Sequence, residues 1–143
     1  MQNKGNYISY LIFLLGSIVI FVFSCTASPR YTSLKTIYGV SSHYGHNDGF
    51  HGKRTANGEI YNHNRLSAAH KTLPLNSIVR VTNLDRLTKP SVTLKINDRG
   101  PYVGDRVLDC STAAAKKLGF FEKGTANVKI EVIKWGDNKY HKH

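Results

Sequence analysis

Three segments of the chain combine charged or amide side chains with glycine or proline, the composition of loops that carry out chemistry. They are Gly49–Tyr61, which contains Glu59, Ser67–Pro74, which contains His70, and Lys95–Tyr102, which contains Asp98. In the third segment an alternating strand breaks into an Arg-Gly-Pro turn directly after Asp98. A carboxyl group at such a break is held in position yet exposed, which suits a general acid or base. Asp98 is therefore our candidate acid/base residue.

These residues also have structural interpretations that the sequence leaves open. Asp98 can bond to backbone N–H groups of its turn, Glu59 can be a surface residue, and His70 can be a buried structural histidine. Tyr61 and Tyr102 can line a sugar-binding groove, since aromatic faces suit pyranose rings, or they can pack in the core.

A metal site has to be considered, because five of the seven histidines lie between His43 and His70. Their spacing matches neither an H-E-x-x-H motif nor a closed zinc pattern. The sequence therefore predicts no metal and no other cofactor.

Alternating apolar residues predict the framework that positions these segments. Ser91–Ile96 and Asn127–Val132 place every second side chain on an apolar face, as half-buried strands do. Thr36–Tyr44 and Ser77–Leu84 are expected strands with weaker alternation. The stretch Asp85–Pro90 is expected to be a hairpin loop between two of the strands.

One helix is expected, over Thr112–Leu118. Ser111 or Asp109 can cap its start and Gly119 can end it. For Asp109 we favour the capping role over a catalytic one. Cys110 lies in apolar sequence and is expected to be a small core residue rather than a nucleophile. Several short strands with one connecting helix predict a small, mainly β barrel.

The first 24 residues have the composition of an export signal. They contain one charged side chain, Lys4, and an apolar run that ends at Phe23. The sequence Val-Phe-Ser before Cys25 resembles a bacterial lipobox, so Cys25 is the expected lipidation site, and several acyl chains would hold the protein firmly at a membrane. The alternative is an uncleaved transmembrane anchor, for which about 17 apolar residues are near the lower limit. If Cys25 carries lipid, Cys110 has no disulfide partner.

The chain that follows the signal is strongly basic. Nineteen of the 20 Lys and Arg and all nine Asp and Glu follow residue 24, which gives a formal net charge of +10. For an exported protein, anionic cell wall or phospholipid headgroups fit this charge better than nucleic acid, although the charges can also be simply solvated. The length allows one domain and excludes a TIM barrel or a multi-span membrane protein. We expect a signal at 1–24, a lipidated tether at 25–35, the domain at 36–135 and a polar tail at 136–143.

The three chemical segments, together with Val79–Leu84 and Leu108–Ala115, closely resemble the rare lipoprotein A (RlpA) family. The match runs from about Ile37 to Ile133, with several separate motifs in the right order. That family has a six-stranded double-psi β-barrel, a fold also seen in expansins and in membrane-bound lytic transglycosylase A. The resemblance implies this barrel here, with one or two short connecting helices.

The resemblance also implies a peptidoglycan lytic transglycosylase. Such an enzyme cleaves the bond between N-acetylmuramic acid and N-acetylglucosamine without water, because the muramic 6-hydroxyl attacks its own anomeric carbon and leaves a 1,6-anhydro end. One carboxyl group can protonate the leaving oxygen and then accept the hydroxyl proton, whereas hydrolases use two. By the family's motifs the catalytic residues are Asp98, Glu59 and His70. The groove contacts that we expect are Asn57, Tyr61, Asn97, Arg99 and Tyr102.

The expected roles follow from the mechanism. Asp98 has to carry a proton at the start, and a nearby negative charge such as that of Glu59 would favour this state, or the two would share a proton. Arg99 is expected to point away from Asp98, toward a substrate carboxylate. His70 is expected to hydrogen-bond the acid or to orient the sugar.

Some features depart from the family's pattern. His43 stands where a tryptophan is common, and His46-Asn47-Asp48 resembles a small insertion beside it. We expect no SPOR domain, and therefore no septal targeting through one. The alternative function is a non-catalytic, expansin-like wall-binding lipoprotein, and a third is a structural lipoprotein that holds the wall by charge. We expect a monomer in the cell envelope, anchored by lipid to the outer or the cell membrane, with peptidoglycan glycan strands and no nucleic acid as its partner.

Overall fold

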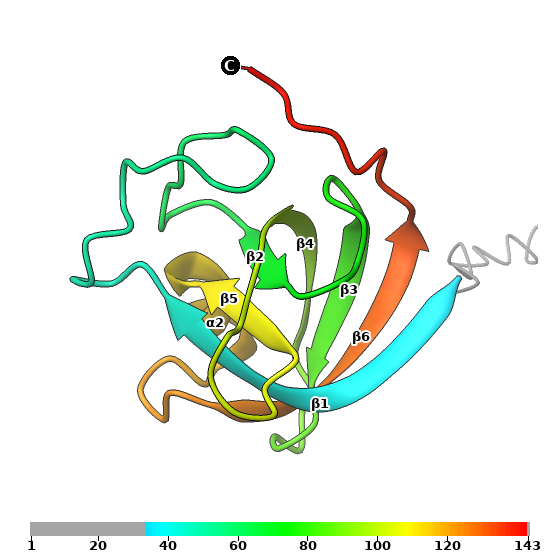
Figure 1. Cartoon of the computed structure of the whole chain (residues 1–143). Coiled ribbons are helices and arrows are strands. Elements are labelled where there is room, and N and C mark those ends of the chain that lie inside the picture. The colour runs from blue at the N-terminus through cyan, green and yellow to red at the C-terminus, as the bar shows by residue number, and fades with distance from the viewer. Residues whose placement is uncertain (1–33, 143) are drawn as a thin grey trace, which may run out of the picture. The chain divides into compact units, whose positions relative to one another are not determined.

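Six strands close into a barrel within residues 34–142, the part of the chain that the computed structural model describes (Figure 1). They are β1 (Lys35–Tyr44), β2 (Ser67–His70), β3 (Ile78–Asn83), β4 (Ser91–Asp98), β5 (Leu108–Ser111) and β6 (Ala126–Lys134), with one helix, α2 (Thr112–Leu118). The predicted mainly β barrel is confirmed. The export signal and Cys25 lie outside the described residues. Within residues 34–142, no helix is both long and apolar enough to cross a bilayer.

The strands follow one another around the barrel in the order β1, β5, β2, β4, β3, β6, and β6 pairs with β1 to close it. The pairs β1–β5 and β2–β4 are parallel, and the other four pairs are antiparallel. Strand β2 therefore lies between β4 and β5. Residues from these three strands, together with β1, meet side by side at one end of the barrel.

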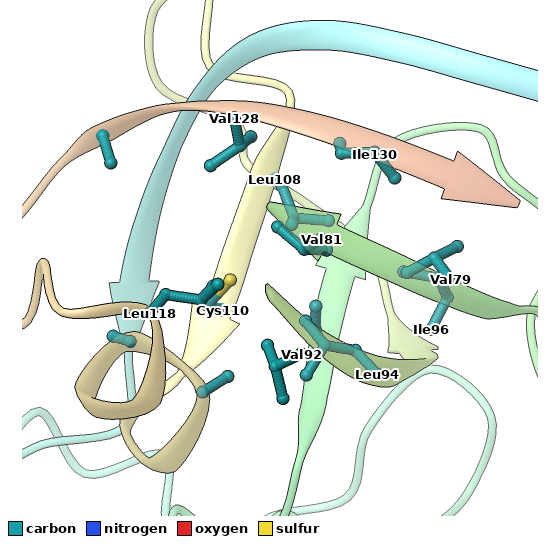
Figure 2. Close-up of a cluster of buried hydrophobic side chains, with 14 of the residues drawn as sticks. Val79, Val81, Val92, Leu94, Ile96, Leu108, Cys110, Leu118, Val128 and Ile130 are labelled. Carbon is teal, nitrogen blue, oxygen red and sulfur yellow. The ribbon is translucent and has the colours of Figure 1, made fainter. Parts of the chain in front are cut away.

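The barrel interior is filled by the alternating side chains that the sequence predicts for β4 and β6. The interior residues of β3, β4 and β6 are all buried, and all but the last are labelled in Figure 2: Val79, Val81, Val92, Leu94, Ile96, Val128, Ile130 and Val132. Burying one such side chain stabilises the fold by about 1.5–3 kcal/mol. The predicted strands at Thr36–Tyr44 and Ser77–Leu84 are confirmed as β1 and β3, and Asp85–Pro90 joins β3 to the antiparallel β4.

The helix begins and ends as its sequence predicts. Ser111 is the N-cap, where its Oγ accepts a hydrogen bond from the N–H of Ala114 at 3.3 Å. Gly119 ends the helix with a φ of 74°, a left-handed conformation that glycine adopts readily. Asp109 therefore does not cap the helix, and its carboxylate is available for another role. Cys110 is a core residue as expected, and burial raises the pKa of its thiol to about 12.

An irregularity between β2 and β4 decides which side chains of β4 share a face with β2. Ala68 pairs with Ile96, but the next residue, Ala69, pairs with Asp98, so β4 contributes one extra residue at this point. A bulge of this kind re-aims the following side chain. Because Ile96 points into the core, simple alternation would send Asp98 inward too. The bulge instead gives Asp98 the face of Ala69.

Candidate active site

One row of paired residues crosses four strands at this end of the barrel. Ser42 of β1 pairs with Asp109 of β5, Asp109 pairs with Ala69 of β2, and Ala69 pairs with Asp98 of β4. Residues that are paired in this way present their side chains on the same face of the sheet. Two carboxyl groups therefore lie on one face of the barrel, with only the small Ala69 between them.

The carboxyl group of Asp98 is held mainly by the backbone. Its Oδ1 accepts hydrogen bonds from the N–H of Ala56 at 3.0 Å and of Arg99 at 2.9 Å. Its Oδ2 faces the hydroxyl group of Tyr44, which donates to it at 3.3 Å. Asp98 is half-buried. Its orientation is thus fixed through Oδ1, while Oδ2 has one neutral partner.

Tyr44 is positioned by a second tyrosine beneath it. The rings of Tyr44 and Tyr61 stack with their centroids 4.6 Å apart, and the Tyr61 hydroxyl donates to the carbonyl oxygen of Tyr44 at 2.8 Å. Gly45 has a φ of 89°, and a Cβ there would lie 2.1 Å from the Tyr61 oxygen, so glycine is required at this point. Burial, followed by the charge of Asp98, raises the pKa of Tyr44. Its phenol is therefore neutral at physiological pH and acts as a donor to Asp98.

Asp109 is a residue of this site that sequence reasoning missed. Its Oδ1 accepts a hydrogen bond from the Ser42 hydroxyl, and a Cβ at Gly100 would lie 3.6 Å from its Oδ2. Gly100 follows Asp98 by two residues, so the Asp109 carboxylate lies against the turn that ends β4. The negative charges of both aspartates act on Tyr44. The signal in the sequence is the position of Asp109 two residues before Ser111, because Ser111 caps the helix and leaves Asp109 without that role.

Glu59 is engaged with partners other than Asp98. Lys95 forms an ion pair with its Oε1, and Asn97 donates to its Oε2 at 3.1 Å. Although burial raises the pKa of Glu59, the hydrogen bonds from Lys95 and Asn97 outweigh this and lower it. Glu59 is therefore an anion paired with a cation. Within residues 34–142, no hydrogen bond joins it to Asp98. The connection between them is the loop that carries both Glu59 and the Ala56 N–H.

His70 ends β2 as a neutral histidine. Its Nδ1 accepts hydrogen bonds from the N–H groups of Thr72 at 3.1 Å and Leu73 at 3.0 Å, so the proton of the ring is on Nε2. Burial and, after it, the positive charge of Arg99 lower the pKa of His70 to about 4. His70 thus shapes the turn after β2, and its Nε2 can only donate at neutral pH.

Arg99 points away from the Asp98 carboxyl group, as expected. Its guanidinium donates to the carbonyl oxygens of His70 at 3.2 Å and Leu73 at 2.8 Å, and to Asn138 Oδ1 at 2.9 Å. These bonds tie the turn after β2 to the C-terminal segment. In this arrangement Arg99 positions the site through its neighbours, and the expected contact with a substrate carboxylate stays a prediction.

The other predicted groove residues divide into scaffold and surface. Asn57 is fully buried, where its side chain bonds to Thr55, Asn76 and the N–H of Glu59. Asn97 is buried as well, and its Oδ1 has no hydrogen-bond partner within the described residues. Tyr61 is buried in its stack but lines, with Glu59, a pocket of about 450 Å³. Tyr102 is 82% exposed and is the predicted groove residue that is open to a ligand.

The C-terminal segment, expected only to be polar, lies against the site. Asn138 exchanges hydrogen bonds with the backbone of Leu75, at 3.1 Å and 3.0 Å. The N–H of His141 donates to the carbonyl oxygen of Asn57 at 2.7 Å. Figure 1 shows this segment continuing from β6 beyond the ends of the barrel strands. It therefore braces both Arg99 and the loop that carries Glu59.

The clustered histidines have local structural contacts. His43 packs on Phe121, with ring centroids 4.8 Å apart, and the rings of His51 and His63 lie 4.4 Å apart. Within residues 34–142, no three His, Cys, Asp or Glu side chains are gathered as metal ligands.

The family of the chain follows from its match to a family model. A model described as lytic transglycolase matches residues 36–130, more than half of the chain. The chain belongs to this family. Its membership and the closed six-stranded barrel confirm the double-psi β-barrel that the RlpA resemblance implies.

Several similar proteins are named endolytic peptidoglycan transglycosylase RlpA. Identity is 50% over 104 residues with the one from Campylobacter jejuni, 59% over 95 with that of Pseudomonas aeruginosa, and 46% over 119 with that of Rickettsia felis. These alignments cover 73%, 66% and 82% of this chain, but 36%, 27% and 51% of those proteins. The chain thus spans about half or less of the length of these relatives.

Solved structures of the same fold are more distant in sequence. A Streptomyces papain inhibitor has a TM-score of 0.55 at 16% identity, with 71% of this chain and 97% of that one covered. An expansin from Clavibacter michiganensis has a TM-score of 0.54 at 18% identity, with 70% and 51% covered. At such identities the likeness establishes the fold alone.

Proposed function

We propose that this protein is a peptidoglycan lytic transglycosylase, which cleaves glycan strands between N-acetylmuramic acid and N-acetylglucosamine and leaves 1,6-anhydromuramic ends. Membership of the lytic transglycolase family supports this proposal. The observation that carries it is the geometry of Asp98, whose Oδ1 is held by two backbone N–H groups while its Oδ2 faces a neutral hydroxyl group. An acid/base group has to keep one orientation through two proton transfers, and a backbone-held carboxyl group does so.

Asp98 Oδ2 carries both transfers in the proposed reaction. In the first, its proton passes to the glycosidic oxygen while the bond from that oxygen to the muramic C1 breaks. In the second, the 6-hydroxyl oxygen of the same sugar bonds to C1 and its proton passes to Oδ2. The carboxyl group is then as it was at the start, and no water is consumed. Acid/base catalysis of this kind contributes about 10²–10⁴-fold in rate.

The neighbours of Asp98 position it and complete the site. Tyr44 donates to Oδ2 and orients it. Asp109 supplies a second carboxyl group on the same face of the barrel, across Ala69 from the acid. Glu59, through Lys95 and Asn97, fixes the loop whose Ala56 N–H holds Asp98. His70 holds the turn after β2 and offers an N–H donor on Nε2, which suits a sugar hydroxyl group.

Digestion of purified peptidoglycan, followed by mass spectrometry of the products, tests the proposal. Release of 1,6-anhydro-muropeptides is the expected result. Reducing ends would instead indicate a hydrolase, a possibility that the two carboxyl groups Asp98 and Asp109 on one face keep open. Sacculi that bind the protein but stay intact would indicate an expansin-like wall-binding module.

We also propose that the protein acts in the cell envelope, held at a membrane by lipid on Cys25. The lipobox-like sequence before Cys25 and the charge of +10 after residue 24 support this location. Incorporation of a labelled fatty acid that is lost in Cys25→Ser, with the variant released from the membrane fraction, is the expected result. A Cys25→Ser variant that stays in the membrane fraction would favour an uncleaved apolar anchor.

A further inference from the structure

A second pocket, of about 530 Å³, opens beside His70 at the end of β2. Its wall comes from the start of β1, the turn after β2 and the segment before β5, and its charged residues are Lys35, Lys71, Asp105 and Arg106. We propose that this pocket binds a carboxylate group carried by the muramic acid residues of the glycan strand. The proposal rests on the proposed function, since it identifies how the same site recognises its polymer.

The pocket has a surplus of positive charge. Three of its side chains are cationic and one is anionic, and His70 adds none because it is neutral. Within residues 34–142, neither Lys35 nor Lys71 nor Arg106 forms an ion pair with a carboxylate. The charges of Lys35 and Lys71 act on His70, after burial and Arg99, and help to lower its pKa. The positive charge of these side chains therefore exceeds the single negative charge of Asp105 in the pocket.

The pocket adjoins the row of carboxyl groups. Val107 lines it and precedes Asp109 by two residues, and its side chain packs over Gly39 against the barrel core. The N–H of Val107 bonds to the carbonyl oxygen of Val40 at 2.9 Å, which continues the β1–β5 ladder to this point. On β2, His70 directly follows Ala69, the centre of the row. Because His70 also lines the pocket, a glycan strand that binds Asp98 and places a hydroxyl group on His70 Nε2 would extend into the pocket.

Carboxylates are the anions that a muramic acid residue offers. The sugar carries a lactyl ether that ends in a carboxyl group, which is ionised when no peptide is attached and becomes an amide when a stem peptide is attached. Stem peptides bring carboxylates of their own, whereas N-acetylglucosamine has none. Lysine and arginine side chains bind carboxylates by charge and hydrogen bonds. The pocket therefore distinguishes the two sugars of the strand and places the muramic residue next to the acid.

A titration of the purified full-length chain, followed by heteronuclear NMR, tests this inference. N-acetylmuramic acid is expected to shift the amide signals of residues 70–72 and 105–107, and N-acetylglucosamine, the same ring without the lactyl group, is expected to leave them unchanged. Muramyl dipeptide separates the two sources of the carboxylate. If only N-acetylmuramic acid binds, the pocket recognises the lactyl carboxylate. If muramyl dipeptide binds, the pocket accepts a peptide carboxylate.

Charge variants distinguish binding in the pocket from non-specific attraction to the overall basic surface. The double variant Lys35→Gln/Lys71→Gln is expected to weaken binding of N-acetylmuramic acid about fivefold, since each partly exposed charge contributes modestly. Lys117→Gln, an exposed lysine of α2, is the control and should leave the affinity unchanged. Equal binding of both sugars, or equal losses in the double variant and Lys117→Gln, would overturn the proposal. Because these readouts need no turnover, their failure is distinguishable from a failure to release anhydro-muropeptides.

Discussion

Asp98 and Asp109 occupy one row of the barrel, each paired with Ala69 from opposite sides. Neighbouring strands are about 4.8 Å apart, so the two backbones are separated by roughly 10 Å across β2. The turn after Asp98 folds back toward Asp109, as the position of Gly100 shows. Ala69 between the two acids is buried, and a Cβ at Gly100 would lie 3.7 Å from its Cβ, so this turn covers the space between the two carboxyl groups.

Replacing Asp98 by Asn removes its ability to transfer a proton while preserving its shape. The amide oxygen of the new side chain can still accept from the N–H groups of Ala56 and Arg99, so the thermal midpoint should change little. Release of anhydro-muropeptides should fall about 10²–10⁴-fold. Glu122→Gln, an exposed carboxylate elsewhere on the barrel, is the matched control. Activity close to wild type in Asp98→Asn would disprove the mechanism.

Asp109 and Ser111 have different roles, although both precede α2. Asp109→Asn should reduce turnover by about tenfold with little loss of stability, because it removes the second carboxylate of the row and not the helix cap. Ser111→Ala should cost about 1 kcal/mol of unfolding free energy while the folded fraction keeps its activity. Urea unfolding and peptidoglycan digestion of both variants check this. The reverse pattern, with Asp109→Asn unstable and active, would restore the capping role.

The comparison of β4 with β2 shows how far the sequence predicts this fold. In β4 and β6 alternation is clear because one face is buried and the other is open. All four residues of β2 are buried, so no alternation marks it, and β5 is equally short. The sequence therefore marks both segments as motifs and does not predict that they are strands.

The sequence predicts which residues form the site better than it predicts the contacts between them. Asp98, Glu59 and His70 lie on neighbouring elements, as the family's motifs imply. The bulge at Ala69 is not visible in the sequence, and it moves Asp98 from the interior face of Ile96 to the face of Ala69, which is also the face of Lys95. A charge partner for Glu59 on the same strand was equally hard to foresee, because strand faces are assigned only when the register is known.

The lowered pKa of His70 makes stability depend on pH. Between the ordinary value of 6.5 and about 4, the unfolded chain binds a proton at this residue and the folded chain does not. The free energy of unfolding should therefore fall as the pH decreases through this window, by up to roughly 3 kcal/mol. In His70→Asn, the side-chain oxygen can replace Nδ1 as the acceptor for Thr72 and Leu73, and this contribution disappears. Urea unfolding at pH 7 and pH 4.5 should show a smaller difference for the variant, and identical differences would contradict the assignment.

The brace formed by Asn138 should be needed for both stability and activity. Asn138→Gly keeps the positive φ of 55° accessible but removes the acceptor for Leu75 and Arg99. The expected loss is about 1–2 kcal/mol, together with lower turnover. Asn138→Asp retains an acceptor and should behave like the wild type. If the two variants have the same thermal midpoint and activity, the segment does not brace the site.

The pairing of β1 with β6 has a consequence for how the molecule assembles. Lys35 pairs with Val132, so the first part of β1 gains its antiparallel partner only when the last strand arrives. The parallel partners of β1 and β2 also come from later in the chain. Topologies with such distant pairings fold slowly, on a scale of milliseconds to seconds, because the ends of long loops have to meet before native contacts can stabilise the fold. A nascent chain would therefore remain open until its last strand is delivered, a state well suited to passage through a narrow translocation channel.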